Sequence, residues 1–183
     1  EHNEKETLKI LSDAGTLIAK KVGDQISVNM GIVTTEWDRI PLTKEMDTLN
    51  VPIHVDGFDS GVAVNIGNPH VVFFGKSIEN INLNEIGPKI EQHHFFPNKT
   101  NVEFIEVVNS NTIKMKVWER GAGITLACGS GACAAVYAGW KKKLIEKNSE
   151  VQLEKGSLHI NIVNNEAIMT GPAEISYNGY IHI

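Results

Sequence analysis

Short segments in which hydrophobic and polar residues alternate cover both ends of the chain. Near the N-terminus, residues 8–11, 16–22 and 25–31 follow this pattern and are separated by the turn sequences SDAG and VGDQ. Alternation between turn residues predicts β-strands, here three short strands in a meander. The C-terminal part predicts four more strands, at 151–156, 157–163, 166–171 and 173–183.

The middle of the chain predicts two further pairs of strands. The apolar runs 61–67 and 70–75 are separated by an Asn-Pro dipeptide. Because proline cannot donate a hydrogen bond within a sheet, these runs are expected to lie on either side of a bend. Residues 101–108 and 112–120 alternate well enough to predict a hairpin.

Two segments predict helices. Residues 84–94 have Asn84 as the expected N-cap. Residues 130–145 are mostly apolar or small and include three lysines near the C-terminal end, where cations suit the helix dipole. Residues 32–60 predict an irregular connection with at most one poor helix. About ten strands and two helices predict the α+β class.

Composition narrows the classes of partner. The chain has 183 residues and a net charge of -5, and its one basic cluster is KKK at 141–143. This balance argues against nucleic acid or an anionic membrane and favours a small soluble ligand. No apolar run reaches membrane-spanning length. The two cysteines are close in sequence and form neither a disulfide framework nor a four-ligand metal site. We therefore expect a reducing, cytoplasmic setting and no metal.

Cys128 stands where the glycine-rich run GAGITLACGSG turns into the predicted helix. A thiol at a helix N-terminus lies near unpaired amides and the positive end of the dipole, which predicts a lowered pKa and a reactive thiolate. The glycines nearby allow backbone amides to approach an anion. The alternative is a small buried cysteine in a tight turn. Cys133 lies one turn inside the predicted helix among alanines and is interpreted as a small core residue. Cys128 is therefore expected to be the more reactive thiol.

Four motifs occur in order along the chain: GNPHVV at 67–72, FFPNKTNVEF at 95–104, WERGAGITLACGSGACAA at 118–135 and MTGPAE at 169–174. Together they resemble the diaminopimelate epimerase family in order and spacing over nearly the whole chain. Proline racemases also carry a cysteine turn of this kind, but they are not expected to carry GNPH or ERGAG in these places.

The resemblance implies an isomerase that converts LL-diaminopimelate to the meso form, on the route to lysine and peptidoglycan, without pyridoxal phosphate or another cofactor. Two cysteines face the substrate from opposite sides in such an enzyme. One thiolate removes the α-proton, and the other thiol donates a proton to the opposite face. Preorganised amides and dipoles stabilise the carbanion-like charge.

The resemblance also assigns roles to individual residues. Cys128 matches the second of the two family cysteines. Gly129 and Ser130 match the amides that bind the substrate α-carboxylate. Glu119 matches the carboxylate that meets the substrate ammonium, and Arg120 matches a guanidinium that clamps a carboxylate.

Three more candidates come from the other motifs. Asn68 and Asn101 match side chains that contact the distal end of the substrate, and His70 is a candidate to orient or polarise the site, so that Cys128, Glu119 and His70 form the predicted catalytic set. Each has a structural alternative. The asparagines are common turn residues, His70 is equally well a histidine satisfied beside a strand, and the Glu-Arg pair suits a solvated surface.

The first family cysteine lies in a motif of the form CGNGxRC, which this sequence lacks. The opening EHNEKETLKILSDAGTLIA resembles the segment that follows this motif, so the chain is expected to begin just downstream of it. Cys133 cannot take its place, because it lies in the helix that Cys128 precedes. The chain alone is therefore expected to be an inactive fragment whose uncovered cleft face favours self-association, for instance as a homodimer.

The family fold implies two pseudo-symmetric lobes, each a β-barrel-like sheet wrapped around a central helix, with the site in the cleft. Residues 1–30 and 174–183 are expected to be remnants of the N-terminal lobe, and residues 31–173 a nearly complete C-terminal lobe. Two other functions stay open. One is a proline-racemase-like racemase or isomerase, and the other is a binding or structural module of the same fold.

Overall fold

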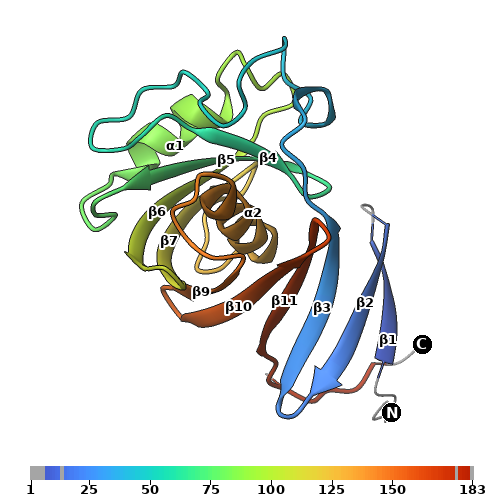
Figure 1. Cartoon of the computed structure of the whole chain (residues 1–183). Coiled ribbons are helices and arrows are strands. Elements are labelled where there is room, and N and C mark those ends of the chain that lie inside the picture. Colours follow the sequence, from blue (N-terminus) through green and yellow to red (C-terminus); the bar gives the residue numbers. More distant parts are fainter. Residues whose placement is uncertain (1–6, 13–14, 176, 182–183) are drawn as a thin grey trace.

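The structure, a computed structural model, describes residues 7–12, 15–175 and 177–181, which contain one continuous mixed sheet (Figure 1). The strand order is β1-β2-β3-β11-β10-β9-β7-β6-β5-β4, and the short β8 pairs with β7. The strands are β1 Thr7–Ser12, β2 Gly15–Val22, β3 Gln25–Ile32, β4 Val62–Asn65, β5 Pro69–Gly75, β6 Asn101–Asn109, β7 Thr112–Glu119, β8 Gly123–Ile124, β9 Asn148–Leu153, β10 Gly156–Val163 and β11 Glu166–Pro172. The helices are α1 Leu83–Glu91 and α2 Gly129–Lys141, with a 3-10 turn at Trp37–Arg39.

Helix α2 lies inside the curve of the sheet, which wraps around it (Figure 1). The helix contacts strands on both arms of the curve: β4, β5, β6, β9, β10 and β11. Every residue from 131 to 139 is buried. A helix that is apolar or small on all faces is buried on all faces, and its alanines let the strands approach closely. The predicted α+β fold, with a sheet wrapped around a central helix, is confirmed.

Both helices are crossover connections between parallel strands. Helix α1 connects β5 to β6, and α2 lies between β7 and β9; both pairs are parallel. Parallel neighbours require such a crossover because a tight turn cannot join them.

The two helices cover opposite faces of the sheet. In β5, Val72 and Phe74 belong to the core around α2, whereas Val71 and Phe73 belong to the core beneath α1 and the 40–58 segment. Alternate residues of one strand point to opposite faces. Because β5 is buried on both faces, its sequence is an unbroken apolar run and not an alternating pattern.

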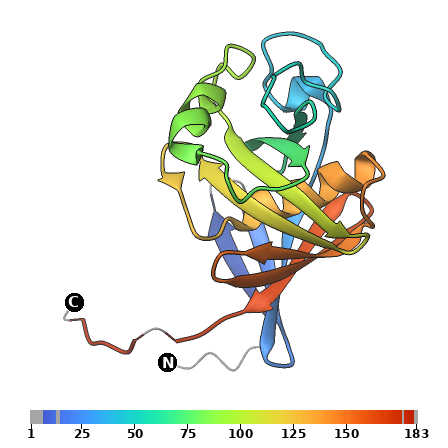
Figure 2. The ribbon, with the colours of Figure 1, turned by 90° about the vertical axis from the view of Figure 1, so that its left-hand side faces the viewer.

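Strands β1 to β3 extend the same sheet beyond α2, through the pairing of β3 with β11 (Figure 2). Several of their apolar side chains are partly exposed, and Leu11 has 85% of its surface accessible. The predicted meander is confirmed by the pairing of β2 with both β1 and β3. The division into lobes at residues 30 and 174 stays a prediction.

Several predicted boundaries are wrong. Helix α1 begins at Leu83, after Asn82, so Asn84 is not its cap. Helix α2 ends at Lys141, because the chain turns at Lys143, where φ is +60°. The strand predicted for 173–183 is not formed by residues 173–175 or 177–181, and its remaining positions lie outside the described residues.

Candidate active site

Cys128 is the N-cap residue of helix α2, as the sequence predicted. Its backbone is extended, and its Sγ accepts a hydrogen bond from the Gly131 amide at 3.4 Å. The Ser130 hydroxyl lies 3.5 Å from the same sulfur. The thiol is thus placed against the first turn of the helix, where backbone amides have no partner within the helix. Only 7% of its surface is exposed.

The expected lowering of the Cys128 pKa is wrong. Burial raises the pKa of this thiol to about 12, and the negative charge of Glu103, followed by the smaller effect of Glu119, acts in the same direction. The hydrogen bonds from Ser130 and Gly131 lower the pKa but do not outweigh burial. Cys128 is therefore a neutral thiol at pH 7 in the free protein.

Cys133 lies within α2 and is fully buried. Burial raises the pKa of this thiol as well. The interpretation of Cys133 as a small core residue agrees with its place in the core around α2.

The first turn of α2 is closely packed. An ideal Cβ built on Gly129 would lie 2.9 Å from Met169 Sδ, and one built on Gly131 would lie 2.8 Å from Glu103 Oε1. Glycine at these positions thus lets β11 and β6 approach the helix N-terminus. The Glu103 carboxylate faces this turn directly.

Glu119 and Arg120 lie at the end of β7, where the chain enters the ERGAG loop. Glu119 Oε1 accepts a hydrogen bond from the Thr125 hydroxyl. The Arg120 guanidinium donates through Nη1 to the Asn98 carbonyl at 3.2 Å. Glu119 thus contacts Thr125 and acts on Cys128 only through its charge, whereas Arg120 is directed to the loop before β6.

Asn101 connects the motif loops through both polar atoms of its side chain. Its Nδ2 donates to the Pro69 carbonyl at 2.9 Å, and its Oδ1 accepts from the Arg120 amide at 2.9 Å. The side chain is 4% exposed. This geometry makes Asn101 a clamp between the start of β5 and the end of β7, and its contact with a substrate stays a prediction.

His70 is fully buried at the start of β5 and has oxygen atoms at both ring nitrogens. Nδ1 lies 2.6 Å from Glu103 Oε1, and Nε2 lies 3.0 Å from Asn68 Oδ1. Asn68 is only half-buried. A connected row of polar groups therefore leads from Asn68 through His70 and Glu103 to the Cys128 turn.

Two buried carboxylates were missed by the sequence analysis. Glu103 lies near the start of β6, between buried Val102 and Phe104. Glu91 accepts hydrogen bonds from Trp118 Nε1 at 2.7 Å and from the Gly121 amide at 3.1 Å, and so holds the ERGAG loop. An acidic residue within an apolar strand was the available signal for Glu103, but its alternation with apolar residues was compatible with a solvent-facing position.

Burial raises the pKa of Glu91, but the hydrogen bonds from Trp118 and Gly121, together with the charge of Lys99, outweigh this effect and leave the pKa below its ordinary value.

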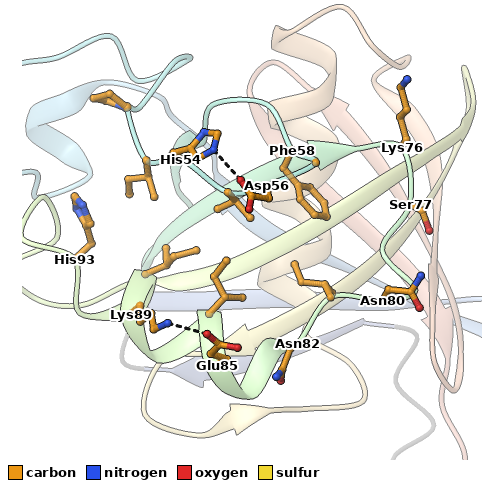
Figure 3. A pocket seen from close by; sticks show the side chains of 17 residues that line it. His54, Asp56, Phe58, Lys76, Ser77, Asn80, Asn82, Glu85, Lys89 and His93 are labelled. Carbon is orange, nitrogen blue, oxygen red and sulfur yellow. Dashed lines mark hydrogen bonds and ion pairs between the residues drawn. The ribbon is translucent and has the colours of Figure 1, made fainter.

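A surface cavity of about 860 Å³ lies between the 52–58 segment and α1 (Figure 3). Two pairs of polar side chains in its lining interact: His54 with Asp56, and Lys89 with Glu85. None of the predicted site residues lines it. A smaller cavity of about 260 Å³ includes Thr125, the hydrogen-bond donor to Glu119, and so borders the candidate site.

Within residues 7–12, 15–175 and 177–181, no cluster of three or more His, Cys, Asp or Glu side chains is placed to hold a metal ion. Over the same part of the chain, no helix has the length and apolar character needed to cross a membrane.

Comparison with solved structures shows the fold. The chain superposes on a hydroxyproline epimerase from Agrobacterium vitis with a TM-score of 0.65 at 13% identity, covering 94% of this chain and 58% of that one. A phenazine biosynthesis protein of the PhzF family from Enterococcus faecalis gives a TM-score of 0.64 at 15% identity, covering 99% and 66%.

Comparison with curated sequences identifies the family. The profile named diaminopimelate epimerase matches residues 62–176. The diaminopimelate epimerase of Pelagibacter ubique is 42% identical over 175 residues, covering 92% of this chain and 64% of the relative. That of a Wolbachia strain from Drosophila simulans is 48% identical over 153 residues, covering 82% and 58%. The chain thus spans about three fifths of the length of these relatives. It belongs to the diaminopimelate epimerase family.

Proposed function

We propose that the intact protein is a cofactor-independent diaminopimelate epimerase, which inverts one α-carbon of LL-diaminopimelate to give meso-diaminopimelate. The observation that carries this proposal is the Cys128 thiol at the N-terminus of α2, with the Gly131 amide donating to its sulfur. Family membership supplies the substrate. In this role the protein acts in the cytoplasm, in the synthesis of lysine and peptidoglycan precursors, and a homodimer is the proposed assembly.

In the proposed reaction, Cys128 exchanges a proton with one face of the substrate α-carbon. The amides of Gly129 and Ser130 hold the α-carboxylate at the helix N-terminus, where the dipole favours an anion. The same amides stabilise charge that spreads from the carbanion into the carboxylate. Glu119 meets the α-ammonium group.

Substrate binding makes the thiolate of Cys128 easier to form. The pKa of Cys128 is raised to about 12 by burial and then by the carboxylates of Glu103 and Glu119. An ammonium group beside Glu119 offsets part of that negative charge and lowers the cost of forming the thiolate. The thiolate then forms mainly in the complex, and the buried thiol is a ready proton donor in the opposite direction.

Inversion requires a second acid-base group on the opposite face of the α-carbon. Cys133 is excluded from this role, because it is fully buried inside α2 and lies on the same side of the substrate as Cys128. In the proposal, the second thiol comes from a part of the intact protein outside the 183 residues of this chain.

The test is to incubate the intact gene product with LL-diaminopimelate in deuterated water. Chiral chromatography measures formation of the meso isomer, and proton NMR measures loss of the α-proton signal. We expect inversion with deuterium incorporation, and a loss of at least about 100-fold in kcat for Cys128→Ala, the usual scale for removing an acid-base group. Cys133→Ala is the matched control and keeps most of the activity.

Two outcomes would contradict the proposal. If the intact protein exchanged the α-proton of proline but not that of diaminopimelate, the substrate would be wrong. If the 183-residue chain alone inverted diaminopimelate at the rate of the intact protein, the requirement for a second thiol would be wrong.

A further inference from the structure

The reaction as described above gives His70 no role and uses Glu103 only as a negative charge near Cys128. Both side chains are fully buried, and His70 Nδ1 lies 2.6 Å from Glu103 Oε1. Removing two ionisable groups from water is costly, and such a pair persists only with close hydrogen bonding. A pair of this kind beside the Cys128 turn is therefore a candidate for a functional role.

The pair connects two parts of the site. On one side, Glu103 Oε1 lies against the first turn of α2, 2.8 Å from the position that a Gly131 Cβ would occupy. The Cys128 sulfur lies 3.3 Å from that same position. On the other side, the His70 ring reaches half-buried Asn68 through Nε2. Movement of the Glu103 side chain would thus disturb the thiol turn and the Asn68 loop together.

The hydrogen bonds of the Glu103 carboxylate are unequal. Oε1 contacts His70, whereas Oε2 is buried and accepts no hydrogen bond from the described residues. A buried carboxylate with a single strong contact depends on that contact for most of its stabilisation. The orientation of the His70 ring and the charge of Glu103 are therefore coupled.

Resting on the function proposed above, we propose that Glu103 is a positioning residue, which fixes the His70 ring through Nδ1 and places a buried negative charge against the Cys128 turn. The ring then presents Nε2 to Asn68 in a single orientation. The charge adds to the effect of burial, which is the larger one, in keeping Cys128 in the thiol form until substrate binds.

The groups that face the Cys128 sulfur come from several elements. Glu103 on β6 and Glu119 on β7 carry negative charge, and Ser130 and Cys133 belong to α2 itself. His70 on β5 acts through Glu103. Among these groups, only Glu103 both faces the thiol turn and holds the histidine, so replacing it separates its effect from that of Glu119.

The test compares Glu103→Gln with Glu103→Asp. Glutamine keeps the size and removes the charge, whereas aspartate keeps the charge and shortens the side chain. Glu106→Gln is the matched control, because Glu106 lies on the same strand but bonds to Lys114 and the Ile78 amide instead.

The first readout is the rate at which iodoacetamide labels Cys128 in the 183-residue chain at pH 8, followed by mass spectrometry. We expect labelling about 3- to 10-fold faster in Glu103→Gln, because loss of a nearby charge raises the thiolate fraction more than it lowers nucleophilicity. Glu103→Asp and Glu106→Gln should label at the rate of the unmodified chain. If the substitutions only loosened the packing, Cys128 would be labelled faster in Glu103→Asp by as much as in Glu103→Gln, and Cys133 would also be labelled.

The second readout is nitrogen NMR of the His70 ring, which reports the hydrogen on Nδ1. We expect this hydrogen to be fixed in the unmodified chain and in Glu103→Asp, and to lose its single defined signal in Glu103→Gln. The third readout is epimerase kinetics of the intact protein. There, kcat should fall by about 10- to 100-fold in Glu103→Gln with KM nearly unchanged.

Unchanged labelling together with an unchanged ring signal in Glu103→Gln would overturn the inference, as would equal acceleration in Glu103→Asp. The labelling and NMR readouts need no substrate. Absence of epimerase activity from the unmodified intact protein would thus contradict the proposed function and leave the decision about Glu103 to these two measurements.

Discussion

The raised pKa of Cys128 makes a quantitative prediction about its chemistry in the free chain. A pKa of about 12, against about 8.5 for an unperturbed cysteine, lowers the thiolate fraction at pH 7.5 by more than about three orders of magnitude. A more basic thiolate is a better nucleophile, which recovers about 1.5 of those orders. Alkylation of Cys128 at pH 7.5 should therefore be about 100-fold slower than that of a small free thiol.

The assay is timed labelling of the native 183-residue chain with iodoacetamide between pH 7 and 10, with the two cysteines separated by peptide mass spectrometry. The Cys128 rate should rise about tenfold per pH unit across this range, because the thiolate fraction does so well below the pKa. Cys133 should label more slowly than Cys128 at every pH, since its side chain is fully buried. Glutathione in the same tube serves as the reference thiol.

Two results would refute this reasoning. Labelling of Cys128 as fast as glutathione at pH 7.5 would mean that the helix N-terminus outweighs burial and the two carboxylates. Labelling that levels off below pH 9 would place the pKa in the ordinary range for a cysteine. Preferential labelling of Cys133 would separately contradict the assignment of Cys128 as the more reactive thiol.

Three further predictions concern stability. Gly131→Ala should lower the free energy of unfolding in urea by about 1–2 kcal/mol, because a methyl group packed against Glu103 costs more than the roughly 1 kcal/mol that alanine adds to a helix. Glu91→Gln should cost about 1–3 kcal/mol at pH 7, because glutamine has one acceptor oxygen where the carboxylate uses two, one for Trp118 and one for the Gly121 amide of the ERGAG loop. This difference should shrink below about pH 4, because a carboxylate with a lowered pKa stabilises the fold above its unfolded pKa and loses that effect as pH falls. Above about pH 8.5 the free energy of unfolding of the unmodified chain should fall by up to about 1.4 kcal/mol per pH unit for each buried thiol, because the thiol ionises at a lower pH in the unfolded state than in the folded state. In Cys133→Ala the free energy of unfolding should fall less steeply with pH.

Controls make these outcomes specific. Gly129→Ala should cost less than Gly131→Ala, because its Cβ meets the flexible end of Met169 rather than a hydrogen-bonded carboxylate. If both variants lost the same free energy of unfolding, the argument that a methyl group at position 131 is crowded by Glu103 would be wrong. Replacement of the exposed Glu85 by Gln should leave the acid dependence unchanged, and an unchanged acid dependence in Glu91→Gln as well would contradict the assigned role of Glu91. Identical alkaline slopes with and without Cys133 would show that this thiol does not contribute.

Local signals in the sequence determined most of the elements. The hairpin from β6 to β7 and the bend between β4 and β5 follow from alternation, apolar runs and turn residues. The buried helix after Cys128 follows from its small and apolar composition. The family motifs also led to the cysteine turn without any coordinates. These features depend on neighbours close in sequence, and such signals are readable from a single chain.

Tertiary structure alone decided the environment of the site. The sequence placed Cys128 at a helix N-terminus and so predicted a lowered pKa. Burial and the approach of Glu103, which lies 25 positions earlier on another strand, raise the pKa instead. The pairing of His70 with Glu103 likewise depends on the parallel pairing of β5 with β6 across the α1 crossover. A pKa depends on solvent exclusion and on charges brought together from distant segments, and neither is encoded in the local pattern around one cysteine.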